Sequence, residues 1–420
     1  MKKLRYLCLL LLCAVLVAGM LGGCADFIRI DLLGLDPAFV AYLDAPEQYV
    51  LFRSNYEGST EENLYVPLEE ILAYQTQYPD CNGTYFRDQL SGEDLAIYNA
   101  HLYALENSHG YFEMFVANNE KDFTYIREYL SLDTPFLEQN FNTEGETVWL
   151  WDEGDRIGFS MEQFTEARWE LKMQALASCR NIVANLPQGL DQEQTMLHLY
   201  RYVCDSVEYI TYEDGYDQDF LYDAVCVGKT NCDGYSNMLA LLYNLAGIDC
   251  CEAMGSELED PDNATEEELE ASEGHTWVVA QLDGTYYNFD PTYEDSSEDF
   301  PAEPPIYFRF SDELVDMASM DCDLLRPRCT DTAWDFDYTQ LTVENITDKK
   351  QIREIARYTD RQTKQGNYTT YVLVTSPVSE EAYDGLLDIY IEMVNNISYV
   401  TTDWLDFGHY SVIRFVTEPW

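Results

Sequence analysis

The chain has few basic residues and very few histidines. Against 77 Asp and Glu stand only 24 Lys and Arg, which gives the 420 residues a formal charge of -53, and there are five His. A surface this acidic repels the phosphates of nucleic acids and the headgroups of anionic lipids. We therefore exclude nucleic acid as a partner and expect any membrane attachment to come from a separate segment.

The sequence also lacks the ligand spacing of common metal sites. No pair of cysteines has the CxxC spacing of structural zinc sites, and no acidic loop has the fixed pattern of an EF-hand. We predict no metal and no other cofactor. The composition, 46% hydrophobic and 14% aromatic, excludes disorder as the overall state, and the length suffices for two or three domains.

A long apolar run stands at the start of the chain. Residues 1–24 read MKKLRYLCLLLLCAVLVAGMLGGC, with basic residues first, then an apolar stretch and then small residues, the order of a secretory signal peptide. The end Leu21-Gly22-Gly23-Cys24 resembles a bacterial lipobox, which implies that Cys24 becomes the lipidated first residue. An uncleaved membrane helix is the alternative. Both interpretations place the remaining chain outside the cytoplasm.

Composition and periodicity divide the chain into four parts. We predict a signal peptide at 1–23, an aromatic-rich, helical N-terminal region at 24–155, a central domain at 156–340 and a small αβαβ domain at 345–420. Apolar residues at helical spacing predict three helices before residue 212. These run from about Ser91, its expected cap, to about Asn107, from Met161 to about Ala184, and from about Asp191. The αβαβ domain is predicted as helix 349–364, strand 368–375, helix 380–395 and strand 410–417.

Two segments have a strongly biased charge. Residues 259–274 contain eight Asp and Glu without apolar periodicity, and we expect a solvated loop there. The helix predicted at 349–364 is the only basic stretch of the mature protein. We interpret it as a solvated face that pairs with the acidic remainder, and an anionic ligand is the alternative. Its basic residues are Lys349, Lys350, Arg353, Arg357, Arg361 and Lys364.

The cysteine count suggests a functional thiol. Once the signal peptide and Cys24 are set aside, nine cysteines remain, and an odd number in an exported chain indicates one thiol beside others that could pair. Connectivity cannot be deduced from sequence, and many of these residues could be buried small hydrophobes. The nine are Cys81, Cys179, Cys204, Cys226, Cys232, Cys250, Cys251, Cys322 and Cys329.

Cys232 is the cysteine with a distinctive context. The run Thr-Asn-Cys232-Asp-Gly234-Tyr235-Ser leads directly into an apolar helical stretch that ends at Gly247. This pattern places Cys232 at a helix N-terminus, where unpaired N–H groups and the helix dipole favour a reactive thiolate. A buried, inert cysteine is the alternative.

A hairpin is predicted downstream, because Asp283-Gly284 separates two apolar and aromatic runs. Counting back from that turn pairs Trp277 with Asp290 and places His275 and Asp290 on one face as diagonal neighbours. Their Cβ atoms would then lie roughly 7 Å apart or less. The Asp290 carboxylate could hold one imidazole nitrogen and leave the other free to act on a thiol. The other histidines, His101, His109, His198 and His409, are interpreted as structural.

These residues resemble the transglutaminase-like superfamily, whose core is a papain-type Cys-His-Asp arrangement. Three motifs match in order over about residues 195–295: Cys232-Asp-Gly234-Tyr235-Ser, His275-x-Trp277 and Asn288-x-Asp290-Pro-Thr-Tyr. The resemblance implies an α+β fold with the Cys-bearing helix packed on an antiparallel sheet. It also implies Cys232 as nucleophile, His275 as general base and then acid, and Asp290 as the group that orients it.

The sequence therefore predicts a lipid-anchored enzyme that forms a thioester on Cys232 and transfers the acyl group to water or an amine. Its substrate would be a peptide or protein, with cell-wall peptides included on the ground of location. The rival hypothesis is a non-catalytic surface binding module that retains the fold. Capture of Cys232 in a disulfide, with Cys226 nearest in sequence, would favour that rival.

Overall fold

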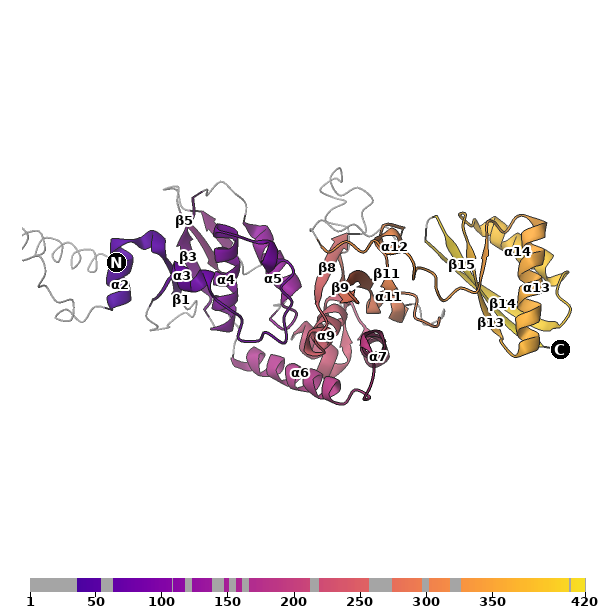
Figure 1. Cartoon of the computed structure of the whole chain (residues 1–420), viewed down its shortest axis with the longest axis horizontal. Helices are drawn as coiled ribbons and strands as arrows, with labels where there is room; N and C mark the ends of the chain where they lie inside the picture. Colours follow the sequence, from indigo (N-terminus) through magenta and orange to yellow (C-terminus); the bar gives the residue numbers. More distant parts are fainter. Residues whose placement is uncertain are drawn as a thin grey trace, which may run out of the picture.

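A computed structural model gives the fold as three groups of elements along the long axis of the molecule (Figure 1). Each group is built around its own sheet, and the fold is α+β, as predicted. Residues 1–35, which include Cys24, lie outside the described residues, as do Cys322 and the acidic run apart from Gly274. The described residues are 36–53, 63–107, 109–117, 123–137, 147–150, 156–160, 166–211, 219–256, 274–296, 302–317, 326–407 and 409–419.

The N-terminal group is not simply helical, contrary to the prediction. It contains a five-stranded antiparallel sheet of order β2-β1-β3-β5-β4. Three successive residues of β1, Val50 to Phe52, are buried, so this strand shows no apolar alternation by which it could be recognised. The elements are α2 (Pro37–Asp44), β1 (Tyr49–Arg53), β2 (Leu64–Pro67), α3 (Leu68–Leu72), α4 (Glu93–Glu106), β3 (Tyr111–Phe115), α5 (Thr124–Asp133), β4 (Thr147–Leu150) and β5 (Arg156–Ser160).

The predicted cap of α4 is wrong. The helix begins at Glu93 behind Gly92, whose φ of 60° lies in the left-handed region, and no side chain caps it. Ser91 therefore takes no part in the cap. The helix is also buried on nearly every side from Ala96 to Leu102, which matches its place between the sheet and α5.

Among the described residues, the central group places six α-helices, three of them short, around an antiparallel sheet of order β11-β10-β9-β8. Asp191 caps α7 with a reciprocal capping box to Gln194, and Gly247, at φ 76°, follows the end of α9 as predicted. The elements are α6 (Glu166–Ala184), α7 (Gln192–Ser206), β6 (Glu208–Tyr209), α8 (Phe220–Tyr222), a π-helical turn (Asp223–Val227), β7 (Lys229–Thr230), α9 (Cys232–Leu245), β8 (Cys250–Ser256), β9 (Gly274–Leu282), β10 (Thr285–Phe289), α11 (Pro291–Ser296), β11 (Phe308–Phe310) and α12 (Asp312–Met317).

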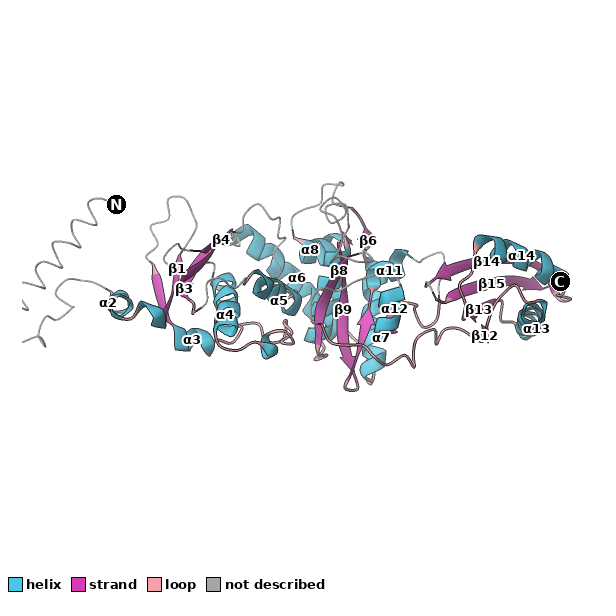
Figure 2. Ribbon diagram, turned by 90° about the horizontal axis from the view of Figure 1, so that it is seen from above, coloured by secondary structure: helices cyan, strands magenta, loops and turns pink. Residues whose placement is uncertain are grey.

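The C-terminal group contains the four predicted elements and two strands that the prediction missed. Helix α14 is shorter than predicted and ends at Ile391, and β12 and β14 extend the sheet to the order β12-β13-β15-β14. The two helices lie on the outward side of this sheet, at the end of the molecule opposite α2 (Figures 1 and 2). The elements are β12 (Leu341–Val343), α13 (Lys349–Gln365), β13 (Thr369–Val374), α14 (Glu380–Ile391), β14 (Ile397–Asp406) and β15 (Ser411–Pro419).

The central sheet is buried on both faces. Val278, Ala280 and Leu282 of β9 share a core with α9 and with the N-terminal group. On the other face Trp277 and Val279 share a second core with residues of the C-terminal sheet such as Tyr371 and Val412. No helix among the described residues has both the length and the apolar composition of a membrane span.

Candidate active site

Cys232 is the first residue of α9 and is 9% exposed. Asn231 caps this helix, because its side-chain oxygen accepts a hydrogen bond from the amide of Gly234 at 3.4 Å. The first amides of a helix lack acceptors within it and form the positive end of its dipole. Cys232 therefore lies where negative charge is stabilised and where its own backbone N–H could donate to an oxyanion.

Gly234 and Tyr235 fix the first turn of α9. A Cβ atom on Gly234 would lie 2.1 Å from Oγ1 of Thr230, so only glycine fits beside β7. The buried Tyr235 donates from its hydroxyl to the carbonyl of Val207 at 2.9 Å and lies 2.6 Å from the carboxylate of Asp295. Gly234 thus allows the turn that carries Cys232 to pack closely on β7, and Tyr235 connects this turn to Val207 and Asp295.

A buried ion pair supports the segment that leads into β7. Nζ of Lys172, on α6, lies 2.8 Å from Oδ2 of Asp219, and the two side chains are 1% and 0% exposed. Asp219 also caps α8 through the amide of Tyr222. Since α8 and the π-helical turn directly precede β7 and Cys232, this pair fixes the path of the chain into the nucleophile.

His275 and Asp290 are brought together as the hairpin predicted. Nε2 of His275 lies 2.6 Å from Oδ2 of Asp290, and the Asp290 side chain is fully buried. Asp290 is itself held firmly, since its other carboxylate oxygen accepts from the amide of Tyr293 and its carbonyl accepts from the hydroxyl of Tyr200. The carboxylate can therefore orient the imidazole.

The other ring nitrogen of His275 is available to exchange a proton with the Cys232 thiol. Nε2 of His275 is engaged by Asp290, so Nδ1 is the ring nitrogen left to act on Cys232, whose sulfur interacts electrostatically with the imidazole. Burial by itself lowers the pKa of His275, but the Asp290 carboxylate and the Cys232 sulfur outweigh it and raise the pKa to about 10. The arrangement thus keeps the imidazole protonated at neutral pH, with a proton to deliver.

The predicted strand pairing ends earlier than expected. The β9–β10 ladder has the predicted register, from Leu282 opposite Thr285 to Val278 opposite Phe289. Beyond Phe289 the chain turns into α11, so Asp290 does not pair with Trp277 as predicted. Proline at 291 has no N–H for a ladder and is well suited to the first position of a helix, which explains the turn. Asp290 is therefore a junction residue and not a strand residue.

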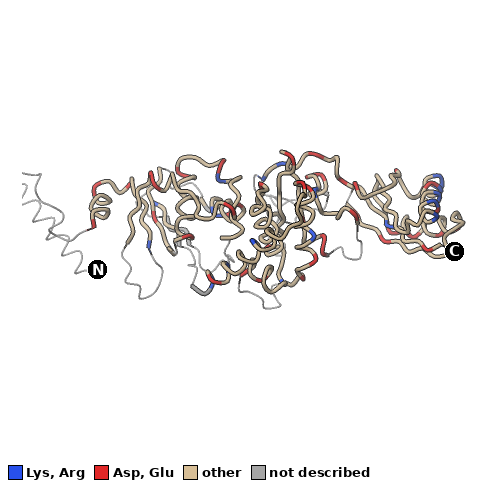
Figure 3. Tube along the Cα trace, turned by 60° about the horizontal axis from the view of Figure 1, so that its bottom comes forward, with Lys and Arg blue, Asp and Glu red and all other residues tan. Residues whose placement is uncertain are grey.

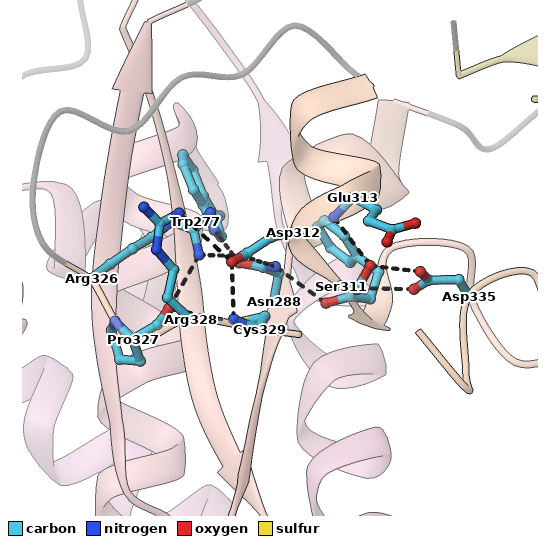
Figure 4. Close-up of polar contacts among 11 residues, drawn as sticks. Trp277, Asn288, Ser311, Asp312, Glu313, Arg326, Pro327, Arg328, Cys329 and Asp335 are labelled. Carbon is cyan, nitrogen blue, oxygen red and sulfur yellow. Dashed lines mark hydrogen bonds and ion pairs between the residues drawn. The ribbon is translucent and has the colours of Figure 1, made fainter. Parts of the chain in front are cut away.

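Trp277 and Asn288 form a support behind His275. The Trp277 ring lies nearly parallel to the imidazole, with centroids 6.1 Å apart, and its indole N–H donates to Asn288 at 2.9 Å. Asn288 in turn donates to Asp312, which also accepts from Arg326 (Figure 4). Arg326 lies over the Trp277 ring, 5.7 Å from its centroid. The network thus fixes Trp277 from both its edge and its face.

Sequence reasoning missed a direct link between the nucleophile and base elements. Oγ1 of Thr276 donates to Oδ1 of Asp233 at 3.1 Å, and Asn231 donates to the other oxygen of Asp233 at 3.0 Å. A hydrogen bond thus joins Asp233, the residue after Cys232, to Thr276, the residue after His275. Only the position of Asp233 and Thr276 beside the two candidates could have indicated this link. Arg326 and Asp312 gave no such signal, since they lie outside the matched motifs.

The other histidines and thiols differ from this site. His101 is buried on α4, and burial lowers its pKa to about 3, which fits a neutral structural residue. The eight described cysteines are free, so Cys226 does not capture Cys232, and only Cys226 is exposed. Burial raises the pKa of the Cys81 thiol to about 12 and that of Cys250 and Cys251 well above the ordinary value. Within the described ranges no His, Cys, Asp or Glu cluster is arranged to hold a metal ion.

A cysteine at a helix N-terminus, facing a histidine that is held by an aspartate at the end of the next strand, defines a papain-like thiol site. The comparison with family models agrees with this class. Residues 180–291 match the model of the Transglutaminase-like superfamily, and this segment, which includes Cys232, His275 and Asp290, is a transglutaminase-like domain.

Two solved structures are similar to the chain, and no curated protein matches it. One is described as a candidate cysteine protease from Cytophaga hutchinsonii, with 9% identity, 37% of this chain and 69% of that chain covered, and a TM-score of 0.22. The other is described as a candidate protease from Parabacteroides distasonis, with 12% identity, coverage of 66% and 62%, and a TM-score of 0.24. This chain thus spans less than two thirds of the second protein.

Proposed function

We propose that the protein is a cysteine enzyme that forms a thioester acyl-enzyme on Cys232 and passes the acyl group to water or to an amine. The arrangement that carries this proposal is Cys232 at the N-terminus of α9, in electrostatic contact with His275, whose Nε2 lies 2.6 Å from Asp290. The match to the Transglutaminase-like superfamily supports the same class of chemistry.

The reaction follows from these positions. The Cys232 sulfur attacks the carbonyl carbon of an amide, the C–S bond forms, and the negative charge on the oxygen lies near the amide of Cys232. His275 then gives its proton to the amide nitrogen, the C–N bond breaks, and the amine leaves. Water or a second amine attacks the thioester while His275 takes its proton, and the C–S bond breaks to return the sulfur to its initial state.

The proposed substrates are peptides or proteins outside the cytoplasm, cell-wall peptides among them. The support is the signal-peptide pattern of residues 1–23 and the lipobox-like end at Cys24, which would attach the enzyme to the outer side of the cell membrane. Peptides and proteins outside the cytoplasm are the amides to which an enzyme at that location would have access.

The test of the nucleophile is labelling of the folded, full-length protein with an iodoacetamide probe at neutral pH, followed by peptide mapping. We expect the label on the peptide that contains Cys232, and none in Cys232→Ala. Cys226→Ala is the matched control, because Cys226 is the exposed thiol of the described residues and its loss should leave labelling intact. Preferential labelling of Cys226 would contradict the assignment and favour the binding-module hypothesis.

The anchor is tested separately. Intact-mass analysis of the protein from its native membrane should show a chain that begins at Cys24 and carries acyl groups, and Cys24→Ala should release the protein or misplace it. Retention of residues 1–23 in the mature protein would contradict lipidation. That outcome would leave the proposal for Cys232 untouched.

A further inference from the structure

Helix α13 presents a continuous row of cations to solvent. Its basic side chains are all exposed, and they make up six of the 24 Lys and Arg of the chain. Figure 3 shows the blue positions gathered on this helix near the C-terminus, in contrast to the scattered ones elsewhere. We call this set the α13 row; its members are Lys349, Lys350, Arg353, Arg357, Arg361 and Lys364.

The α13 row is narrow and straight. At about 100° per residue the six positions fall within one sector of about 120° on the helix. At 1.5 Å per residue the row is about 22 Å long. The opposite side of α13 is buried against the sheet through Ile352, Ile355 and Ala356. The row is therefore one outward stripe, and the helix cannot rotate to hide it.

Among the described residues, most of the row forms no ion pair with the acidic remainder, contrary to the interpretation from sequence. Lys364 lies 3.4 Å from Asp360, one turn earlier. Asp360 also accepts from the backbone amides of Asn395 and Asn396, so its charge is shared with that loop. Over the described part of the chain the other five cations of the row form no ion pair with any Asp or Glu.

The surroundings of the row decide between possible partners. Helix α14 packs beside α13, with the hydroxyls of Thr359 and Tyr390 2.6 Å apart, and the charged residues on its exposed side are all acids. A flat anionic membrane would meet both helices and be repelled by α14. A second copy of the chain, at -53, would be repelled as a whole. These acids of α14 are Glu380, Glu381, Asp384 and Asp388.

A thin, linear polyanion avoids both the repulsion by the acids of α14 and the repulsion between two acidic protein surfaces. It can follow a single helix, and charges more than about 8 Å away are largely screened at physiological salt. Three of the six cations are arginines, whose planar guanidinium group binds phosphate oxygens in pairs. We propose that the α13 row binds a thin, linear polymer with repeated phosphate groups and no bases. A nucleic acid duplex is broader than one helix and would still meet the acidic surface that excludes it. This inference does not rest on the proposed chemistry of Cys232.

The test measures binding of fluorescently labelled linear inorganic polyphosphate to the full-length protein by anisotropy at several salt concentrations. With about six phosphate contacts we expect the affinity to fall roughly 10³-fold between 50 and 200 mM salt. The triple variant Arg353→Gln, Arg357→Gln, Arg361→Gln should reduce the salt slope by about half and weaken binding at low salt at least about tenfold.

The matched control removes three exposed arginines that are already paired with acids, by Arg53→Gln, Arg180→Gln and Arg201→Gln. It changes the net charge equally and should leave binding intact. Equal loss in both triple variants, absence of binding, or equal binding of polyglutamate would overturn the proposal. So would row-dependent binding to vesicles of anionic phospholipid, or row-dependent self-association in sedimentation. Labelling of Cys232 should be unchanged in both variants, which separates this test from that of the proposed function.

Discussion

Asp290 is held in place through both its side chain and its backbone. One carboxylate oxygen faces His275 and the other accepts from Tyr293, while its carbonyl and amide bind Tyr200 and Tyr307. The carboxylate therefore has almost no freedom of its own. Any loss of function in its variants should reflect lost orientation and charge at His275.

The first prediction concerns the order of damage within the site. His275→Ala should lower turnover by about 10²- to 10⁴-fold, because it removes the proton donor and acceptor. It should also move alkylation of Cys232 to more alkaline pH. Asp290→Ala should lower turnover less, since water can partly replace an orienting carboxylate. The measurements are the rates of turnover and alkylation against pH.

Asp290→Asn is the control for charge, because it retains an acceptor of similar shape. Its pH profile should lie between those of the wild type and Asp290→Ala. A His275→Ala variant with the wild-type profile would contradict the assignment of the base.

The second prediction concerns the bond between Asp233 and Thr276. Thr276→Val keeps the shape of the side chain but removes the donor to Asp233, at a cost to stability of about 1–2 kcal/mol. Because the bond joins the elements of Cys232 and His275, alkylation of Cys232 should slow several-fold. Thr285→Val, on the neighbouring strand, is the control. Equal slowing in both variants would show that the bond has no special part in positioning.

At the scale of elements, the third prediction concerns the start of α9. Gly234→Ala places a Cβ atom 2.1 Å from Oγ1 of Thr230, so the first turn of the helix must shift. Overpacking of this kind costs about 1–3 kcal/mol, and we expect loss of Cys232 labelling as well. Chemical denaturation and probe labelling measure the two effects.

Gly385→Ala is the matched control, because a Cβ atom there meets nothing within 4 Å on helix α14. That variant should stabilise the protein by about 0.5–1 kcal/mol, since alanine favours the helix. Normal labelling in Gly234→Ala would mean that the turn tolerates the shift and that its geometry is not critical.

Elements with local signals could be predicted from the sequence, and those held by distant partners could not. The Asp283-Gly284 turn fixed the register that brings His275 to Asp290, and Asp191 marked the start of α7. Strand β14 has a single fully buried residue, Ile397, and owes its place to β15, so its sequence shows only a weak alternation. The contacts of Trp277 with Arg326 join segments about 50 residues apart, and no local pattern encodes them.

At the scale of the whole molecule, the fourth prediction concerns stability against pH. Burial is the main cause that raises the pKa of Asp133 to about 6 and of Glu294 to about 7. Both values lie above the unfolded values near 4. The stability from these groups is therefore complete below about pH 4 and is lost as the pH rises through 6 and 7. The ion pair of His275 acts in the same direction, since its contribution is lost as the pH rises through about 10.

We therefore expect the melting temperature to fall by several degrees from pH 5 to pH 9. Glu294→Gln should show a smaller fall, because the glutamine keeps an acceptor for the amide of Tyr307 without titrating. High salt separates this effect from general repulsion among surface acids, which it screens. A melting temperature that rises toward alkaline pH would contradict the prediction.

The burial of most of the described thiols has a consequence for oxidation of the protein. Oxidants, like electrophiles, react with accessible thiolates, and sulfenic acid formation is the first step of that damage. Cys81, Cys250 and Cys251 are buried with raised pKa values, so they present neither access nor charge. Peroxide should therefore act on Cys232, beside His275, before these three thiols, with the exposed Cys226 as the competing site. A reductant that reverses sulfenic acid should then restore Cys232 without refolding the protein.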